Sequence, residues 1–461
     1  MSTEATPEWG AVAEEAVEEL RTLLRFETVN PPGNEGACAD YIESRLREAG
    51  AEVERFESEG RPNVVARVRG TGGGEPLLLT GHMDVVPVER ECWTVDPFAA
   101  EIQGEFLYGR GALDMKGMLA MSLWVTCRLA QEVTSGQRVL DRDLIFAAVS
   151  DEEAGCRHGS RFLVEEHPES VRAGWMIGEF GGFSMEVQGE RVYPIQVAEK
   201  GIVRLAIRTT GAPGHGSVPH EDMAVVHLAR ALDRIAQRPL PWHPTRAVRV
   251  FLQGIASTRS GMARWVLPKL ASPRWGPLLL RTLIADERLR ASFTAMLSNT
   301  CSPNLISAGE KINVIPGRAE VRCDGRTVPG QTAADLKREL LERCAGLPIE
   351  IEIEEEVPGR ENDHECPLFE QMCAEIREAD PEGHPVAYLM PGFTDGTYFG
   401  RLGMRCYGFS PLQLPADFRF WDGVHGHDER TYLPGYRWGL RVLFRVVAGW
   451  CTRGKGTESD A

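Results

Sequence analysis

The sequence predicts an α/β protein built around a mostly parallel sheet flanked by helices, with a second domain inserted into the first. Three short apolar runs, PLLLTG, DLIFAAVS and AGWMIG, alternate with helical patterns such as EAVEELRTLLRF and ACADYIESRLREAG. This alternation is typical of a parallel sheet covered by helices. After about residue 199 the pattern changes, and a length of 461 residues exceeds what one hydrophobic core usually fills.

The inserted domain is predicted at about 199–357, so the first domain comprises 1–198 and 358–461. It reads as a ferredoxin-like module of β-α-β-β-α-β order. Its elements are, in order, GIVRLAIRTTG, DMAVVHLARALDRIAQ, NLISAGE, AEVRCDG, TAADLKRELLERC and PIEIEIEEE. The first domain then resumes with strands in AYLMPG and MRCYGFS and a last helix, GYRWGLRVLFRVVAGW, before a small, polar tail, TRGKGTESDA, that is predicted to be disordered.

Residues 240–300 exceed what this module needs and read as helical and apolar. Two interpretations remain open. The segment adds core or a subunit contact, or it forms a lid over a hydrophobic acyl group.

Charge and composition exclude several classes of partner. With 51 basic and 67 acidic residues the net charge is −16, which opposes binding to nucleic acid or to an anionic membrane surface. No apolar run reaches the ~18 residues of a membrane span, and the acidic start lacks a signal-peptide pattern. The 11 cysteines are scattered without a CxxC pair, as reduced buried thiols are. We therefore expect a soluble cytoplasmic protein whose metal ligands are histidines and carboxylates.

Metal-type side chains follow the three apolar runs of the first domain. PLLLTG is followed by His82 and Asp84, DLIFAAVS by Asp151-Glu152-Glu153, and AGWMIG by Glu179. Because the carboxyl ends of parallel strands form one crevice, these groups are predicted to converge. A further carboxylate, Asp114, stands where a glycine-rich turn meets a helix start, whose partial positive charge suits an anion.

Each of these residues also has a structural explanation: a helix cap for Asp114, a solvated acidic turn for residues 151–153, and a hydrogen-bonded structural histidine for His82. Their common placement favours a shared site. Carboxylates gathered in one crevice repel one another, and divalent cations are the usual remedy.

Seven motifs, in order along the chain, carry a resemblance to a known family. They are GHMDVVPV, GRGALDMKG, SDEEAG, EKG with GHGS, KINVIPG with DGR, FTDG and HGHDER. Over about residues 20–445 the chain resembles the zinc hydrolases that include acetylornithine deacetylase, succinyl-diaminopimelate desuccinylase, aminoacylase and bacterial glutamate carboxypeptidase. The resemblance implies a zinc-peptidase-like catalytic domain, with the inserted domain serving as a lid and dimerisation domain.

The resemblance also implies two Zn²⁺ ions per subunit, for which Co²⁺ or Mn²⁺ could substitute. His82 and Glu179 correspond to ligands of one ion, Glu153 and His425 to ligands of the other, and Asp114 to the carboxylate that bridges both. A ligand set of nitrogen and oxygen atoms suits zinc.

Two neighbours of these ligands have implied catalytic roles. Asp84 is expected to hold the other ring nitrogen of His82 and so fix its tautomer. Glu152 is expected to act as general base, taking a proton from a hydroxide-forming water shared by the two ions and passing it to the leaving nitrogen.

Two ligand assignments have rivals nearby. Glu179 is followed by Phe180, where the family usually has proline, so Glu186 is an alternative. His425 stands two residues before His427, and the spacing to Asp428 and Glu429 favours His425.

Further residues match family positions near the substrate. His215 in GAPGHGS corresponds to a lid histidine that reaches the active site of the opposite subunit, and Asn313 to a second polar contact. Arg326 in DGR corresponds to the residue that grips the substrate carboxylate. Thr394 and Asp395 in FTDG are assigned a supporting role.

The leading interpretation is a metal-dependent hydrolase that cleaves an amide bond of a small carboxylate-bearing substrate, either as an N-acyl amino acid deacylase or as a carboxypeptidase or dipeptidase. The resemblance implies a homodimer through the lid domain. Alternatives are an amidohydrolase of N-carbamoyl amino acids or another small amide, a two-metal aminopeptidase, and a non-catalytic binding protein that keeps the fold. No nucleic-acid or membrane partner is expected.

Overall fold

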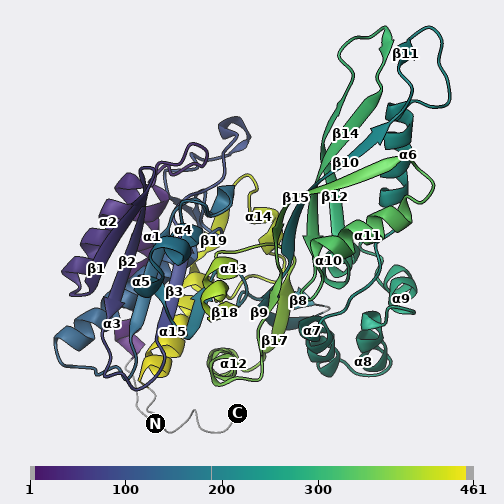
Figure 1. Cartoon of the computed structure of the whole chain (residues 1–461). Coiled ribbons are helices and arrows are strands. Elements are labelled where there is room, and N and C mark those ends of the chain that lie inside the picture. The colour runs from purple at the N-terminus through teal and green to yellow at the C-terminus, as the bar shows by residue number, and fades with distance from the viewer. Residues whose placement is uncertain (1–5, 188, 453–461) are drawn as a thin grey trace. The chain divides into compact units, whose positions relative to one another are not determined.

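The computed structural model describes residues 6–187 and 189–452, which form two compact units (Figure 1). One unit contains the chain up to Val197, Asn362–Val386 and the residues from Thr394 onward, and the other contains Ala198–Glu361 and Ala387–Phe393. The predicted disorder of the tail at 453–461 concerns residues outside the described ones. No helix within the described residues is long and apolar enough to span a bilayer.

The first unit is built on a twisted sheet whose central strands are parallel. β6 and β7 run parallel to β3, and β18 runs parallel to β7, whereas β1, β2 and β9 join antiparallel. The predicted α/β class with a mainly parallel central sheet is therefore confirmed. In spatial order the strands are β1 (Glu52–Ser58), β2 (Arg61–Val68), β6 (Leu144–Val149), β3 (Leu77–His82), β7 (Trp175–Gly178), β18 (Arg405–Gly408) and β9 (Glu190–Glu199).

Shorter strands complete this unit. β8 (Met185–Val187) and β17 (His384–Met390) pair with β9. A separate three-stranded sheet contains β4 (Glu101–Gln103), β5 (Phe106–Tyr108) and β19 (Arg430–Tyr432).

The helices of the first unit cover this sheet. α3 (Lys116–Thr134) lies against β3 and β6 and also contacts α1 (Thr6–Leu24) and α15 (Leu433–Cys451). Its sequence is apolar around the whole circumference and nearly all of it is buried, as expected for a helix enclosed on every side. The remaining helices are α2 (Gly36–Glu48), α4 (Ser160–Glu166), α5 (Pro168–Val171), α12 (Pro367–Ala379), α13 (Gly396–Phe399) and α14 (Phe420–Gly423).

The second unit contains an antiparallel sheet of order β12-β14-β10-β15. Along the chain its elements are β10 (Gly201–Thr210), α6 (Ala224–Ala236), β12 (Thr300–Ala308), β14 (Arg318–Thr327), α11 (Ala333–Arg343) and β15 (Ile349–Val357). Val203, Leu205 and Ile207 alternate along β10 and form a core with residues of α6 and α11, such as Leu228 and Leu336.

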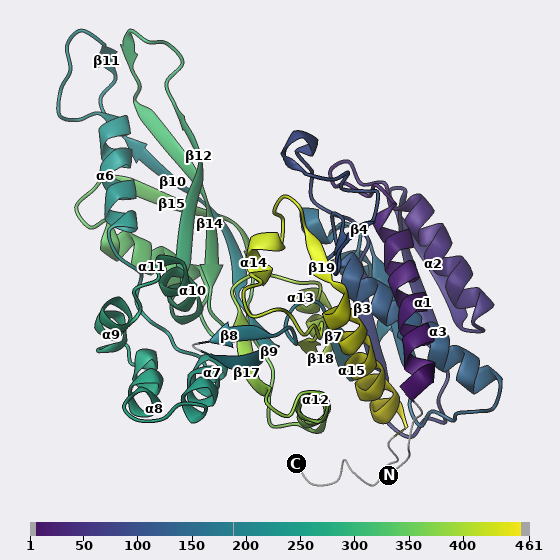
Figure 2. The same ribbon diagram turned by 180° about the vertical axis from the view of Figure 1, so that it is seen from behind.

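Two small pairings lie at opposite ends of this sheet. β11 (Gly214–His215) pairs with β13 (Val314–Ile315) at the tip of the unit (Figures 1 and 2). β16 (Arg360–Glu361) pairs with the last residues of β9.

The apolar segment at about 240–300 is helical, and its helices differ in what they bury. They are α7 (Arg246–Ser257), α8 (Ala263–Val266), α9 (Gly276–Leu283) and α10 (Glu287–Leu297). α7 begins at the N-cap Thr245 and buries Leu252 and Ile255. α10 buries Phe293 and Leu297, so these two helices add core, whereas α8 and α9 leave several large apolar side chains exposed.

The helix α15 approaches a neighbouring loop so closely that two of its residues have no room for a side chain. A Cβ added at Gly439 would lie 1.7 Å from the carbonyl oxygen of Pro411, and one at Gly435 would lie 2.0 Å from that of Gln413. Both contacts are with backbone atoms, which cannot move aside cheaply. By contrast, a Cβ on the exposed Gly10 of α1 would meet nothing within 4 Å.

This contrast predicts opposite effects for the same substitution in two helices. Gly439→Ala should lower the free energy of unfolding by about 1–3 kcal/mol through overpacking. Gly10→Ala should leave it unchanged or raise it by up to ~1 kcal/mol, because alanine is the better helix former. Urea unfolding of both variants measures the difference, and equal stability of the two would contradict the close packing of α15.

Candidate metal centre

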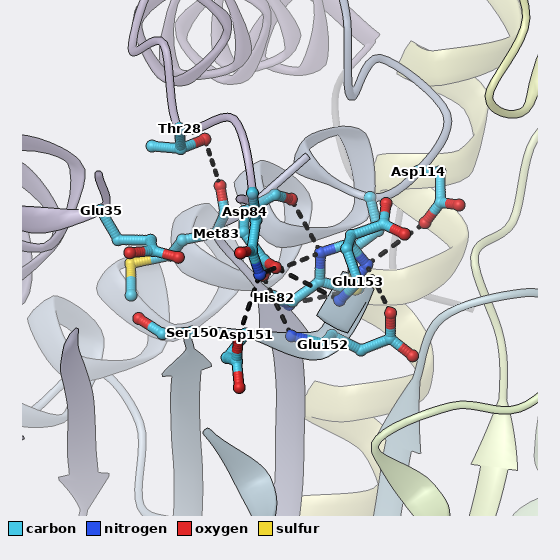
Figure 3. Close-up of polar contacts among 12 residues, drawn as sticks. Thr28, Glu35, His82, Met83, Asp84, Asp114, Ser150, Asp151, Glu152 and Glu153 are labelled. Atoms are coloured by element: carbon cyan, nitrogen blue, oxygen red, sulfur yellow. Dashed lines mark hydrogen bonds and ion pairs between the residues drawn. The ribbon is translucent and has the colours of Figure 1, made fainter. Parts of the chain in front are cut away.

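The three central parallel strands deliver polar residues to one edge of the sheet. His82 is the last residue of β3 and pairs in register with Val149, the last residue of β6. Glu152 and Glu153 follow β6 in a short helical turn, and Glu179 directly follows β7. Figure 3 shows His82 facing the acidic loop after β6. The strand ends therefore bring these groups together, as their positions in the sequence predicted.

The carboxylate of Asp114 lies between two imidazoles. Its Oδ1 is 3.2 Å from Nε2 of His82, and its Oδ2 is 3.1 Å from Nε2 of His425. Each imidazole also faces a second carboxylate: Nε2 of His82 lies 3.4 Å from Oε2 of Glu179, and Nε2 of His425 lies 3.2 Å from Oε2 of Glu153. The arrangement is two matching sets of donors that share one carboxylate.

Burial and mutual repulsion perturb every acid in this cluster. Burial raises the pKa of Glu152, Glu153 and Glu179, and neighbouring carboxylates add to the rise. Burial would also raise the pKa of Asp114, but the two imidazoles hold it below its usual range.

The pKa values of both imidazoles are raised as well. Contacts with Asp114 and Glu153 raise the pKa of His425 to about 10. Burial works to lower the pKa of His82, yet the carboxylates beside it raise it well above its usual value. The pocket therefore favours positive charge at both positions.

Buried carboxylate oxygens without hydrogen-bond donors also indicate that the pocket favours positive charge. Both carboxylate oxygens of Glu179 and one of Glu153 are buried and accept no hydrogen bond from the described residues. Such groups are costly unless a cation binds them. The nitrogen and oxygen donors fit two divalent metal ions, one beside each imidazole.

Asp84 departs from its expected role. The other ring nitrogen of His82, Nδ1, lies 2.9 Å from the backbone carbonyl of Asp84, whereas the Asp84 carboxylate is 3.6 Å away. That carboxylate instead accepts hydrogen bonds from the Asn30 side chain at 2.8 Å and from the backbone N–H groups of Glu152 and Glu153 at 3.2 Å each. The backbone of Asp84 thus fixes the His82 tautomer, and its side chain positions the acidic loop.

A further buried acid holds the turn that carries Asp114. Glu429 accepts hydrogen bonds from the Arg110 guanidinium at 2.7 Å and from the backbone N–H groups of Gly111, Leu113 and Asp114 at 2.7–3.0 Å. Sequence reasoning missed this role of Glu429 and Arg110. The available signal was the HGHDER motif, in which Glu429 served only as a spacing marker.

A second missed group supports the loop after β6. Asn30 donates to Asp151 as well as to Asp84, and Arg61 pairs with both Glu35 and Asp151. Nothing in the local sequence of these residues pointed to the site, because they reach it only through the fold.

Left-handed backbone conformations cluster at the site. Asp151 has φ 68°, Phe180 has φ 58° and His425 has φ 58°. Non-glycine residues adopt this region rarely and at a cost, and they tend to do so at functional sites. His425 is a ligand candidate, Phe180 follows the candidate Glu179, and Asp151 precedes Glu152, the expected general base.

The two rival ligands lie away from the cluster. Glu186 is on β8 with its carboxylate 3.9 Å from Arg191. His427 is 3.8 Å from Glu89, in an exposed group with Cys92. Of the two pairs of candidates, Glu179 reaches the imidazole of His82, and His425 reaches the carboxylate of Asp114.

Thr394 and Asp395 are both buried in the first unit. Asp395 lies beside Ser160 and Cys156, underneath the loop after β6, and burial raises its pKa to about 6. This position suits support of the loop. Cys156 is one of the nine buried cysteines, and none of the eleven forms a disulfide within the described residues.

The remaining predicted residues lie in the second unit. His215 is exposed at the tip, where its Nδ1 is 2.7 Å from Oγ of Ser217. The carbonyl of Asn313 accepts a hydrogen bond from the N–H of Gly216 at 2.9 Å, so these two segments meet.

Arg326 lies at the other end of the same unit. It donates through two nitrogens to the carboxylate of Asp324, at 2.9 and 3.2 Å, while its third nitrogen is buried without a partner among the described residues. The register of β10 with β14 separates it from the tip, because Arg326 pairs with Ile202 whereas Arg318 pairs with Thr210. Eight residues of strand correspond to roughly 26 Å.

Solved structures share this fold. A family M20 metallo-carboxypeptidase from Sulfolobus solfataricus aligns with a TM-score of 0.71 at 17% identity, covering 94% of this chain and 98% of the other. Human carnosine dipeptidase 1 aligns with a TM-score of 0.68 at 15% identity, covering 96% and 98%. A dinuclear metal-binding peptidase of the same family from Bacillus subtilis aligns with a TM-score of 0.59 at 14% identity, covering 96% and 99%.

Relatives found by sequence include hydrolases of acylated amino acids. A mouse N-fatty-acyl-amino acid synthase/hydrolase, PM20D1, is 27% identical over 388 residues, which are 81% of this chain and 74% of the relative. Human aminoacylase-1 is 26% identical over 447 residues, 93% of each chain. The sequence pattern of peptidase family M20/M25/M40 matches residues 78–449. This chain therefore belongs to peptidase family M20/M25/M40 and is a metal-dependent hydrolase of amide bonds in small substrates.

Proposed function

We propose that this protein is a dizinc N-acyl amino acid hydrolase that cleaves the amide bond next to a free substrate carboxylate. The observation that carries the proposal is the Asp114 carboxylate, which presents one oxygen to each of two imidazoles. One ion would be held by His82, Glu179 and Asp114, and the other by His425, Glu153 and Asp114. Zinc suits these donors, and Co²⁺ or Mn²⁺ could replace it.

When bound, the two ions would polarise the scissile carbonyl and make water a better nucleophile. The protein's own residues then move the proton. Glu152 is nine-tenths buried, with its carboxylate 3.9 Å from Nε2 of His82 and no ligand role in the two donor sets. Because burial and the neighbouring acids raise its pKa, Glu152 is suited to take a proton from the attacking water and return it to the leaving nitrogen.

Substrate recognition is proposed to involve the second unit as a ferredoxin-like lid and dimerisation domain. Its β-α-β-β-α-β order and four-stranded antiparallel sheet support this assignment. The guanidinium of Arg326 would donate two hydrogen bonds to the substrate carboxylate, which would replace the carboxylate of Asp324 as its partner. Thr394 and Asp395 would support the site from beneath its acidic loop.

His215 and Asn313 are proposed to act on the active site of the opposite subunit. The support is the separation within one unit: Arg326 and the tip that carries His215 lie at opposite ends of β14, and a small substrate cannot reach both. The edge strand β12 supports a dimer, because Leu305 and Ile306 are 67% and 63% exposed on it. The lack of disulfides among the described cysteines supports a cytoplasmic location.

Among acyl groups, the relatives favour N-acyl amino acids over N-carbamoyl amino acids. Two of them are an N-fatty-acyl-amino acid hydrolase and an aminoacylase, whereas the hydantoinase/carbamoylase-family amidase from Burkholderia multivorans is similar only in structure, with a TM-score of 0.55 at 13% identity. N-carbamoyl amino acids and dipeptides remain the alternatives for comparison.

The substrate class can be tested on the zinc-loaded protein with N-acetyl and longer N-acyl amino acids, N-carbamoyl amino acids and dipeptides. We expect release of primary amine from N-acyl amino acids that a chelator abolishes and added Zn²⁺ restores. Capping the substrate carboxylate as an amide should lower kcat/KM at least about tenfold, because the charged pair with Arg326 is lost. Faster cleavage of the capped substrates would contradict the proposal.

The role of Glu152 predicts a loss of turnover without loss of metal. Glu152→Ala should lower kcat by roughly 10²–10⁴-fold while two metal ions per chain remain bound. Glu186→Ala is the matched control, since Glu186 also follows the third central strand but lies beside Arg191, and it should keep normal activity. Near-normal turnover of Glu152→Ala would show that another group moves the proton.

Action of His215 across subunits predicts complementation between two inactive variants. Equal amounts of His215→Ala and Glu152→Ala protein, after subunit exchange, should recover about a quarter of the wild-type activity. Half of the dimers are then mixed, and each contains one site with its own Glu152 and His215 of the partner subunit. No recovery, with exchange shown by a tagged subunit, would assign His215 to its own chain.

A further inference from the structure

Five large apolar side chains of the helical segment in the second unit are exposed. Met262, Trp265, Trp275, Leu278 and Leu283 are 79%, 73%, 56%, 57% and 55% exposed. They lie on and around α8 and α9, which pack side by side with α7 through the short turn Leu267–Ala271 (Figures 1 and 2). We call these five residues, with the cations described next, the α8–α9 face.

Other residues of these helices are buried and closely packed, so the exposure of the five apolar side chains is a property of the fold. Leu270 and Leu280 are buried. Gly276, at the start of α9, lies so close to the Trp242 ring and the Leu270 carbonyl that a Cβ would overlap both. These residues therefore hold the helices in place, whereas Trp265 and Trp275 are exposed.

The charges on the α8–α9 face are all of one sign. Arg264, Lys269, Arg274 and Arg281 are exposed, and no acidic residue occurs between positions 259 and 285. None of these four cations forms an ion pair within the part of the chain that the structure describes. In a chain of net charge −16, this is a local reversal of charge.

We propose that the α8–α9 face docks onto the surface of an anionic phospholipid bilayer. Tryptophan and leucine side chains interspersed with arginine and lysine are the composition of surfaces that lie in the headgroup region, where the rings enter the acyl boundary and the cations meet phosphate. Another exposed apolar strip, on β12, differs: Arg322, which pairs in register with Leu305, lies 3.5 Å from Glu320 and 3.4 Å from Glu354 and is neutralised.

The net negative charge of the whole chain does not prevent this contact. At physiological ionic strength, charges are screened beyond about 8–10 Å, so the charges nearest the bilayer decide the interaction. Each cation near the surface strengthens binding by roughly fivefold. The docking surface lies apart from the metal ligands in sequence and uses none of them, so it operates with or without metal and substrate.

Sedimentation with sucrose-loaded vesicles tests this inference on the full chain. We expect the protein to bind vesicles of phosphatidylcholine with phosphatidylserine, to bind pure phosphatidylcholine at least about tenfold more weakly, and to be released by high salt. Brominated acyl chains should quench part of the tryptophan fluorescence, and Trp265→Phe with Trp275→Phe should abolish that part.

Two variants and a matched control separate the contributions. Arg264→Gln, Lys269→Gln, Arg274→Gln and Arg281→Gln together should weaken binding at least about 100-fold. Trp265→Ser with Trp275→Ser should weaken it at least about tenfold. The control changes four exposed arginines of the first unit to Gln, which alters the net charge equally and should leave binding intact: Arg47, Arg157, Arg161 and Arg172.

The outcomes decide the proposal. Binding that depends on phosphatidylserine and is lost in both α8–α9 variants but not in the control supports it. Absence of vesicle binding at low salt overturns it, as does binding that the control lowers equally. If the variants instead change the oligomeric state in sedimentation and vesicles do not bind, the occupant is a second copy of this chain, and the lipid proposal fails. Hydrolysis of a short-chain substrate in solution should be the same in all variants, which shows that they are folded.

Discussion

The contact between the Asp114 carboxylate and the two imidazoles is the interaction on which the site depends. It fixes the distance between His82 and His425, and thereby between the acids Glu179 and Glu153 that face them. Buried carboxylates this close repel one another, and only positive charge makes the arrangement favourable. Divalent cations that bind the folded state and not the unfolded chain therefore stabilise the fold as well as serve the reaction.

The sequence predicts those parts of the site that follow from local order. His82, Glu152 and Glu179 at or just after the strand ends must converge if the sheet is parallel, and Asp114 stands at a helix start. The motifs then supplied His425. The support of Asp114 by Glu429 could not be predicted, because these residues lie 315 positions apart. The contact of Asn30 with Asp84 could not be predicted either. The sequence also does not tell whether the backbone carbonyl or the carboxylate of Asp84 contacts His82, and in the structure the carbonyl is the nearer of the two.

The second unit shows a similar limit. Alternation along β10 and the helical patterns of α6 and α11 predicted the order of its elements. The helical segment at 240–300 was ambiguous, because a periodic apolar stripe looks the same on a helix that faces a core and on one that faces outward. Net charge has the same limit: a sum over the whole chain does not show that the region between 259 and 285 contains no acid.

The distribution of the site along the chain has a consequence for biosynthesis. His82, Asp114, Glu153 and Glu179 all precede the inserted unit, whereas His425 and Glu429 follow it. At ordinary translation speeds, roughly 15–55 s pass between synthesis of Glu153 and of His425. Throughout that interval the nascent chain carries the acids without the second imidazole and without the carboxylate that shapes the Asp114 turn. A chain that ends before His425 therefore has only one of the two imidazoles beside Asp114 and lacks the carboxylate that holds the Asp114 turn.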